Sequence, residues 1–220
     1  MVKKKIFIAC DTTNINKIKR IISNSQIKQI KIGYKFGLEF LNSKNGRNFI
    51  SNLKNKIIFA DLKLHDTVNT MLSTVKALKD LEINYLTVHI AAGLAALKAV
   101  KKVSGKKRII GVTVLTSLNN KDLKLIGFNR SVKNLVVHQA KLARLANLDA
   151  IVCSPHEVEI VRKIFKKEII TPGVQIGKKN YDQKRSMDAK KIKSDWLVIG
   201  RSLTKGNIKN NIKKLIQELK

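Results

Sequence analysis

The sequence has few acidic residues. Only 15 of its 220 residues are Asp or Glu, against 45 Lys and Arg, so its formal net charge is +30. It also has little proline, glycine, cysteine and aromatic side chain, with 2 Pro, 11 Gly, 2 Cys and 5% aromatic residues. These shortages exclude a collagen-like chain, a low-complexity chain and a disulfide scaffold. The hydrophobic content of 44%, in contrast, is ordinary for a globular protein and too high for a disordered one.

Metal-ligand spacings and long apolar runs are also missing. Cys10 and Cys153 stand in apolar runs with no C-x-x-C or Cys/His spacing, so we expect both to be buried and predict no metal site. No stretch approaches the length of about 18 apolar residues that a membrane span requires. The apolar run at 6–10 is too short for a secretory signal. We therefore expect a cytoplasmic protein with no membrane partner.

The basic excess has two interpretations. A charge of +30 is typical of a nucleic-acid-binding protein, but 37 of the basic residues are Lys and only 8 are Arg, the residue best suited to reading bases and phosphates. The lysines are spread along the whole chain, and no aromatic residues are interleaved with them to stack on bases. We therefore predict no nucleic-acid partner and keep a non-catalytic, basic RNA-binding protein as an alternative.

Short runs rich in Ile and Val alternate with longer amphipathic segments. Eight runs are typical of strands buried on both faces: 5–10, 28–33, 56–62, 84–90, 108–115, 149–153, 168–171 and 196–200. Apolar residues at helical spacing predict helices over 68–81 and 208–219, and the sequence SPHE at 154–157 predicts a helix start after the sixth strand. Eight strand–helix units predict a single-domain (β/α)8 TIM barrel over residues 1–220. A doubly wound open sheet is the alternative, because local patterns do not show closure.

Polar side chains stand at or just beyond the ends of the predicted strands. The carboxyl ends of the strands in a parallel barrel meet at one rim, and enzymes with this fold carry out their chemistry there. The residues concerned are Asp11, Lys31, Asp61, Lys63, His89, Thr116, Ser117 and Arg201. Charged residues at strands 1, 2, 3 and 8 therefore predict an active site at this rim.

The segment 59–70, FADLKLHDTVNT, contains the densest group of chemically active residues. Asp61 and Lys63 are two apart on a predicted strand and should point the same way, and Asp66 follows in the loop. Carboxylates nearby hold a lysine protonated, and Lys31 is expected to join Asp61 in an alternating charge array. Such an array needs no metal and can deliver a proton to a developing carbanion. The alternative is a buried ion-pair network that only fixes the rim.

The same segment resembles a known family. DLKLHDTVNT is similar to the D-x-K-x-x-D signature of the orotidine 5′-phosphate decarboxylases, whose usual continuation is HDIPNT. Further segments resemble that family in the same order: IACD (8–11), IKIG (30–33), LTVHIAAG (86–93), GVTVLTS (111–117), AIVCSPHEV (150–158), TPG (171–173) and VIGRSLTK (198–205). The resemblance implies a cofactor-free decarboxylase that converts orotidine 5′-phosphate to UMP and CO₂ in pyrimidine biosynthesis, acting as a homodimer with shared active sites.

The resemblance also implies roles for single residues. Lys63 would protonate C6 of the pyrimidine, and Asp61 would lie beside the departing carboxylate, acting by repulsion or by preorganised charge. Asp66 and Thr70 would reach the nucleotide bound by a partner subunit. The implied substrate contacts are Asp11 and Lys31 at the ribose, Thr116 and Ser117 at the pyrimidine, and Gly200, Arg201 and Gln183 at the phosphate. Gln183 would belong to a phosphate lid over 173–188.

The chain departs from the family pattern in two places, and one enzymatic alternative shares the signature. Thr67-Val68 replace the usual Ile-Pro, and Gln175 replaces a frequent arginine. Sugar-phosphate decarboxylases and aldolases with the same signature hold Mg²⁺ with an acidic residue at the end of strand 2, where Lys31 is expected in this chain. None of the four histidines is predicted to bind a metal. We expect structural roles for His65, His138 and His156, and either packing or substrate contact for His89.

Overall fold

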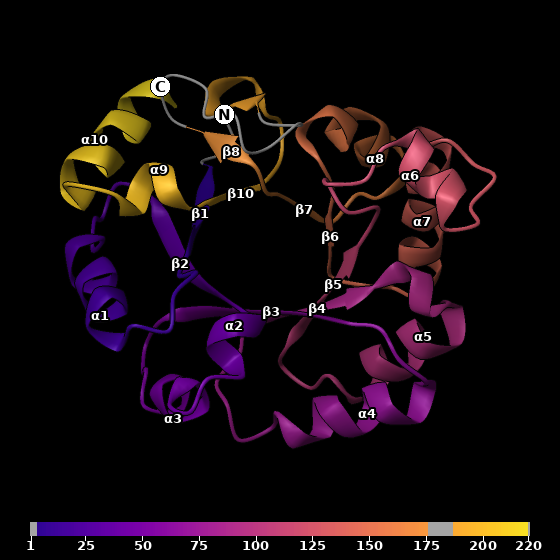
Figure 1. Cartoon of the computed structure of the whole chain (residues 1–220), viewed down its shortest axis with the longest axis horizontal. Coiled ribbons are helices and arrows are strands. Elements are labelled where there is room, and N and C mark those ends of the chain that lie inside the picture. Colours follow the sequence, from indigo (N-terminus) through magenta and orange to yellow (C-terminus); the bar gives the residue numbers. More distant parts are fainter. Residues whose placement is uncertain (1–3, 176–186, 220) are drawn as a thin grey trace.

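The computed structural model describes residues 4–175 and 187–219. Eight parallel strands close into a barrel in the order β1-β10-β7-β6-β5-β4-β3-β2, and helices surround it (Figure 1). The last helix, α10, lies beside the first, α1, where the end of the chain returns to its beginning (Figure 1). The predicted (β/α)8 barrel is therefore confirmed, and the open-sheet alternative is wrong.

The barrel strands are short and are joined by helices. The strands are β1 (Lys5–Ala9), β2 (Lys31–Gly37), β3 (Ile57–Leu64), β4 (Tyr85–His89), β5 (Arg108–Val112), β6 (Ala150–Val152), β7 (Glu168–Thr171) and β10 (Trp196–Ile199). The helices are α1 (Ile15–Asn24), α2 (Leu38–Leu41), α3 (Gly46–Ser51), α4 (Val68–Ala77), α5 (Leu94–Val103), α6 (Asn120–Leu125), α7 (Val132–Leu145), α8 (Val158–Ile164), α9 (Arg201–Thr204) and α10 (Ile208–Glu218). Three short 3₁₀ turns, η1 (Ile90–Ala92), η2 (Pro155–Glu157) and η3 (Ala189–Lys191), and a two-stranded pair, β8 (Val174–Gln175) with β9 (Met187–Asp188), complete the described elements.

Aromatic side chains fill the barrel interior at the end where the strands begin. Phe7 stacks on Trp196 with a centroid distance of 4.0 Å. Phe7 also meets Phe59 at 4.9 Å and Tyr85 at 5.2 Å, edge to face. Gly33 makes room for this cluster, because a Cβ there would lie 2.6 Å from the Phe7 ring. These side chains thus fill the barrel interior at this end.

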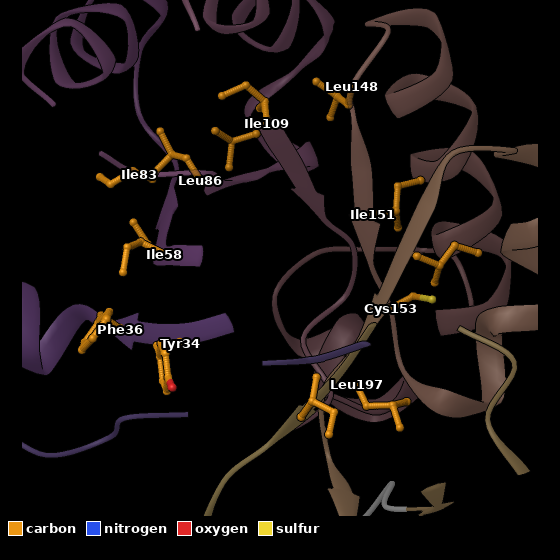
Figure 2. Close-up of a cluster of buried hydrophobic side chains, with 14 of the residues drawn as sticks. Tyr34, Phe36, Ile58, Ile83, Leu86, Ile109, Leu148, Ile151, Cys153 and Leu197 are labelled. Atoms are coloured by element: carbon orange, nitrogen blue, oxygen red, sulfur yellow. The ribbon is translucent and has the colours of Figure 1, made fainter. Parts of the chain in front are cut away.

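A second apolar layer lies between the strands and the helices. Figure 2 shows part of it, including Phe36 of β2, Ile58 of β3 and Ile109 of β5, all fully buried. Each such side chain stabilises the fold by about 1.5–3 kcal/mol relative to an exposed position. Cys10 and Cys153 belong to this layer as buried free cysteines, as predicted. Burial raises the pKa of Cys10 to about 12, so this thiol is not ionised at neutral pH.

Several element boundaries differ from the predictions; β5, for example, ends at Val112 rather than at 115. β2 runs to Gly37 rather than ending at 33, because apolar residues continue to alternate along it. α4 ends at Ala77, and the turns that follow it still bury Leu78 and Leu81. After β6 the chain first makes a 3₁₀ turn, in which the Ser154 N–H donates to Glu157 Oε2 at 3.0 Å, and only then enters α8.

No helix in the described part of the chain is long and apolar enough to cross a membrane.

Candidate active site

A cavity of about 330 Å³ lies at the carboxyl ends of the barrel strands. This volume is within the range of small-molecule sites. Apolar residues from β1, β3, β5, β6 and β10 form its floor, and its polar lining comprises Asp11, Lys35, Asp61, Lys63, Thr116, Arg201 and Ser202. The cavity is therefore at the rim where the sequence predicts chemistry.

Four charged side chains alternate in sign along one part of this lining. Lys63 Nζ donates to Asp61 Oδ2 at 2.8 Å. Lys35 Nζ lies 3.3 Å from the same oxygen and 3.1 Å from Asp11 Oδ1. The order Lys63–Asp61–Lys35–Asp11 has no net formal charge, and each lysine is held by a carboxylate. The predicted array therefore forms, although not with all of the predicted members.

Burial and ion pairing shift the pKa values of Asp61 and Lys35, at the centre of the array, in opposite directions. Burial raises the pKa of Asp61, but Lys35 and Lys63 outweigh it and hold that pKa below its ordinary value. Burial likewise lowers the pKa of Lys35, and Asp61 and Asp11 outweigh it and hold that pKa above its ordinary value. Both groups therefore stay ionised at neutral pH, although their side chains are only 11% and 13% exposed.

The prediction that Lys31 joins Asp61 at the rim is wrong. Lys31 is the first residue of β2, pairs in register with Lys5 at the start of β1, and is exposed at the opposite end of the barrel. Lys35 takes the expected place, four residues further along the strand. The sequence carries the pattern K-x-G twice, at 31–33 and 35–37, and the shorter predicted strand selected the first. The apolar alternation through Phe36 is the signal that selects the second.

Lys63 reaches Asp61 through an irregularity in β3 rather than through regular alternation. Its backbone φ is +48°, in the left-handed region that non-glycine residues seldom occupy. The register of β3 against β4 shifts between Ala60 and Leu64 at the same point. The Lys63 N–H donates instead to Thr87 Oγ1 at 2.8 Å. Sequence reasoning missed Thr87, whose only signal is a polar residue within an apolar strand.

The residues expected at the two ends of the substrate are only partly brought together. Thr116, Gly200 and Arg201 line the cavity. Ser117 is exposed and lies outside the lining. Gln183 and most of the expected lid over 173–188 lie outside the described residues, although Gly173 and Val174, at its beginning, line the cavity.

Asp66 and Thr70 do not line the cavity of their own chain. Both lie in an exposed stretch, residues 65–70. The Asp66 carboxylate accepts the Thr67 N–H at 2.7 Å, and the Thr70 hydroxyl lies 3.0 Å from that of Thr67, which caps α4. Their local bonds hold them at the surface beside the rim.

The histidines are not part of the cavity lining. The rings of His65 and His89 lie 5.5 Å apart beside the array. Burial, His65 and Lys63 together lower the pKa of His89, so this ring is neutral at pH 7. His138 and His156 are exposed in α7 and η2. Within residues 4–175 and 187–219, no three His, Cys, Asp or Glu side chains gather in a group that could hold a metal ion.

Similar proteins have the same fold and share much of the sequence. Residues 4–214 match the model of the orotidine 5′-phosphate decarboxylase / HUMPS family. Proteins named orotidine 5′-phosphate decarboxylase from Wolbachia pipientis and from Sphingopyxis alaskensis are each 40% identical to this chain, over 92% of both sequences in each pair. A crystal structure of orotidine 5′-phosphate decarboxylase from Lactobacillus acidophilus has a TM-score of 0.83 and 26% identity, covering 98% of this chain and 99% of the other. The chain therefore belongs to the orotidine 5′-phosphate decarboxylase / HUMPS family.

Proposed function

We propose that this protein is an orotidine 5′-phosphate decarboxylase, which forms UMP and CO₂ in pyrimidine biosynthesis without a cofactor. The observation that carries the proposal is the Lys63–Asp61–Lys35–Asp11 array beside a cavity of about 330 Å³. The named relatives, at 40% identity over 92% of their length, support the same activity. Residues 1–220 would then form one catalytic domain.

The reaction needs a proton at the carbon that loses CO₂. The bond between C6 of the pyrimidine and its carboxylate breaks, CO₂ leaves, and the electron pair stays on C6. The Lys63 ammonium then donates a proton to C6 to give UMP, and solvent returns a proton to the lysine. One proton is consumed for each CO₂ released, so no redox partner is required.

The array supports this step because its charges are fixed before the substrate arrives. Asp61 keeps the Lys63 ammonium oriented, and Lys35 prevents Asp61 from taking up a proton as it is buried. As CO₂ departs, negative charge moves onto C6, close to the positive end of the array. Preorganised charges of this kind stabilise a transition state without reorganising. Asp11 and Lys35 would also bind the ribose hydroxyls, in the roles first expected of Asp11 and Lys31.

The phosphate would bind at the end of β10. Arg201 lines the cavity there, and its guanidinium can bind a phosphate dianion through two parallel hydrogen bonds. A Cβ at Gly200 would lie 3.7 Å from Ala9, an ordinary contact, so the fold itself does not require glycine. This supports a role for Gly200 in the close approach of a ligand. Thr116 would contact the pyrimidine, and Gln183 would reach the phosphate from the lid.

A homodimer would give Asp66 and Thr70 a function. Both are exposed beside the rim and do not line the cavity of their own chain, as expected of residues that complete a partner's site. We expect a mixture of the inactive variants Lys63→Ala and Asp66→Ala to regain activity, because one site in each mixed dimer would be intact. No recovery after demonstrated subunit exchange would contradict the shared site.

The sugar-phosphate alternative requires an acidic metal ligand at the end of strand 2. Lys35 occupies that place and forms ion pairs with Asp11 and Asp61, the carboxylates that a cation would need. This favours the decarboxylase. The cytoplasmic location and the lack of a nucleic-acid partner stay predictions from the sequence.

The test is to add orotidine 5′-phosphate to the purified protein in the presence of a chelator and to follow the absorbance of the pyrimidine. We expect the absorbance to fall as UMP forms, at a rate proportional to protein concentration. A folded protein that leaves the absorbance unchanged would contradict the proposal. Activity that appears only with added Mg²⁺, on a sugar phosphate, would establish the alternative.

A further inference from the structure

Thr87 joins the two central residues of the site without touching the cavity. It lies in β4, is fully buried and is not part of the cavity lining. Its hydroxyl donates to Asp61 Oδ1 at 3.1 Å and accepts the Lys63 N–H at 2.8 Å. One side chain therefore holds the carboxylate of Asp61 and the backbone of Lys63 at once.

The backbone of Lys63 needs such a partner. A non-glycine residue with positive φ is strained and persists only where its surroundings hold it. The register shift between Ala60 and Leu64 interrupts the regular pairing of β3 with β4 at this residue. Without the Thr87 hydroxyl, the Lys63 N–H would lose the acceptor that replaces the strand ladder. The hydroxyl thus stabilises the conformation that directs Lys63 towards Asp61.

The carboxylate of Asp61 also needs a fixed orientation. Its Oδ2 faces both lysines, at 2.8 Å from Lys63 Nζ and 3.3 Å from Lys35 Nζ, and its Oδ1 accepts from Thr87. The terminal torsion of an aspartate is broad, so ion pairs to a single oxygen allow the carboxylate plane to turn. Thr87 has a stiff, β-branched side chain, and its bond to Oδ1 fixes that plane.

We propose that Thr87 is a positioning residue, which sets the mutual geometry of Lys63 and Asp61 for proton delivery. The proposal rests on the function proposed above. Thr87 is buried beneath the array and acts only through Asp61 and Lys63. Its loss should therefore lower the rate of the chemical step and leave the binding of the nucleotide almost unchanged.

The test compares Thr87→Val, which keeps the shape and removes the hydroxyl, with Thr87→Ser, which keeps the hydroxyl. Thr113→Val is the matched control, because Thr113 is also buried, directly after β5, but its hydroxyl donates to the Val152 carbonyl rather than to a member of the array. We expect Thr87→Val to lower kcat by about 10- to 100-fold, as small misplacements of reacting groups do, with KM changed less than about threefold. Thr87→Ser and Thr113→Val should stay within about threefold of the wild type.

A crystal structure of Thr87→Val gives a readout that does not depend on activity. We expect Lys63 to leave the left-handed region or its Nζ to separate from Asp61 Oδ2. A Thr87→Val protein with the activity of Thr113→Val and an unchanged Lys63 would overturn the positioning role. If the wild type fails to decarboxylate but Lys63 moves in Thr87→Val, the proposed function falls and the positioning of Lys63 by Thr87 stands.

Discussion

The two ends of the barrel each contain a carboxylate that is at least partly buried and accepts several hydrogen bonds. At the carboxyl end, Asp61 binds Lys35, Lys63 and Thr87. At the opposite end, Glu168 of β7 accepts from Lys5 Nζ at 2.8 Å, Arg108 Nη1 at 2.7 Å, the Tyr85 hydroxyl at 3.0 Å and Trp196 Nε1 at 3.2 Å. Both carboxylates have a pKa below the ordinary value, although burial alone would raise it.

The difference lies in what the partners of each carboxylate do. Two partners of Glu168, Tyr85 and Trp196, belong to the aromatic cluster that fills this end of the barrel, so the network ties five strands to a packed core. The partners of Asp61 include Lys63, which lines the cavity on a strained backbone. Similar ion-pair physics therefore stabilises the fold at one end and, under the proposed function, prepares charges for catalysis at the other, as is general for this fold.

The largest expected difference between the two ends is in the effect of removing a lysine. Lys63→Ala should lower kcat by at least about 10³-fold, because the proton donor for C6 is lost, while UMP still binds. Lys5→Ala, at the other end, should leave kcat within about twofold of the wild type, since Lys5 is remote from the cavity. Steady-state kinetics with orotidine 5′-phosphate and calorimetry with UMP measure both effects. Residual activity of Lys63→Ala within tenfold of the wild type would remove Lys63 from its role.

An arginine at each end gives a second comparison. Arg201→Ala should weaken UMP binding by about 10- to 100-fold, the equivalent of 1.5–3 kcal/mol for hydrogen bonds to a charged group, and barely change the binding of uridine. Arg108→Ala, which removes a partner of Glu168, should leave both affinities unchanged. Titration calorimetry with the two ligands decides between these results. Equal losses of UMP and uridine binding in Arg201→Ala would place the phosphate elsewhere.

For the free energy of unfolding, the larger effect should come from the end of the barrel where Glu168 lies. Glu168→Gln should lower the free energy of unfolding by about 2 kcal/mol, because it leaves two cations facing a neutral amide within a partly buried network. Glu159→Gln is the control, since the Glu159–Lys193 pair is largely exposed and its loss should cause no measurable change. Urea unfolding followed by circular dichroism measures both. If the two variants lost equal stability, the network around Glu168 would have no special structural role.

The smallest effect concerns pH. Because the pKa of Glu168 is lowered on folding, its contribution is present above the ordinary carboxyl pKa of about 4 and is lost as pH falls through the folded value. The stability difference between wild type and Glu168→Gln should therefore be constant from about pH 6 to 8 and shrink below about pH 4. Urea unfolding of both proteins at a series of pH values measures it. A difference that grew on acidification would contradict the assignment.

The sequence was sufficient to predict the barrel and part of the site. Alternating Ile/Val runs and amphipathic segments predict eight strand–helix units, and the spacing of Asp61 and Lys63 predicts that their side chains meet. The second K-x-G pattern is missed because the predicted strand ends at 33, whereas the apolar alternation through Phe36 and the pairing of β2 with β3 continue to Gly37. Lys31 was therefore expected where Lys35 lies.

The position of Thr87 in the site could not be predicted from the sequence, for a different reason. A buried threonine in a strand is ordinary, and its meaning here comes from two long-range hydrogen bonds and an irregular register in β3. The local periodicity of the sequence indicates neither these hydrogen bonds nor the irregular register. Asp66 and Thr70 illustrate a further limit, since a single chain shows them as exposed polar residues whether or not a second subunit uses them.

The most direct test of the account compares the two carboxylates in one experiment. Asp61→Asn and Glu168→Gln each remove one negative charge from an ion-pair network, and kcat and the free energy of unfolding are measured for both. We predict that Asp61→Asn lowers kcat by at least about 100-fold, as removal of a preorganised charge does, and that Glu168→Gln keeps kcat within about twofold while losing stability. A loss of kcat in Glu168→Gln as large as that in Asp61→Asn would contradict the division between a reactive and a structural end.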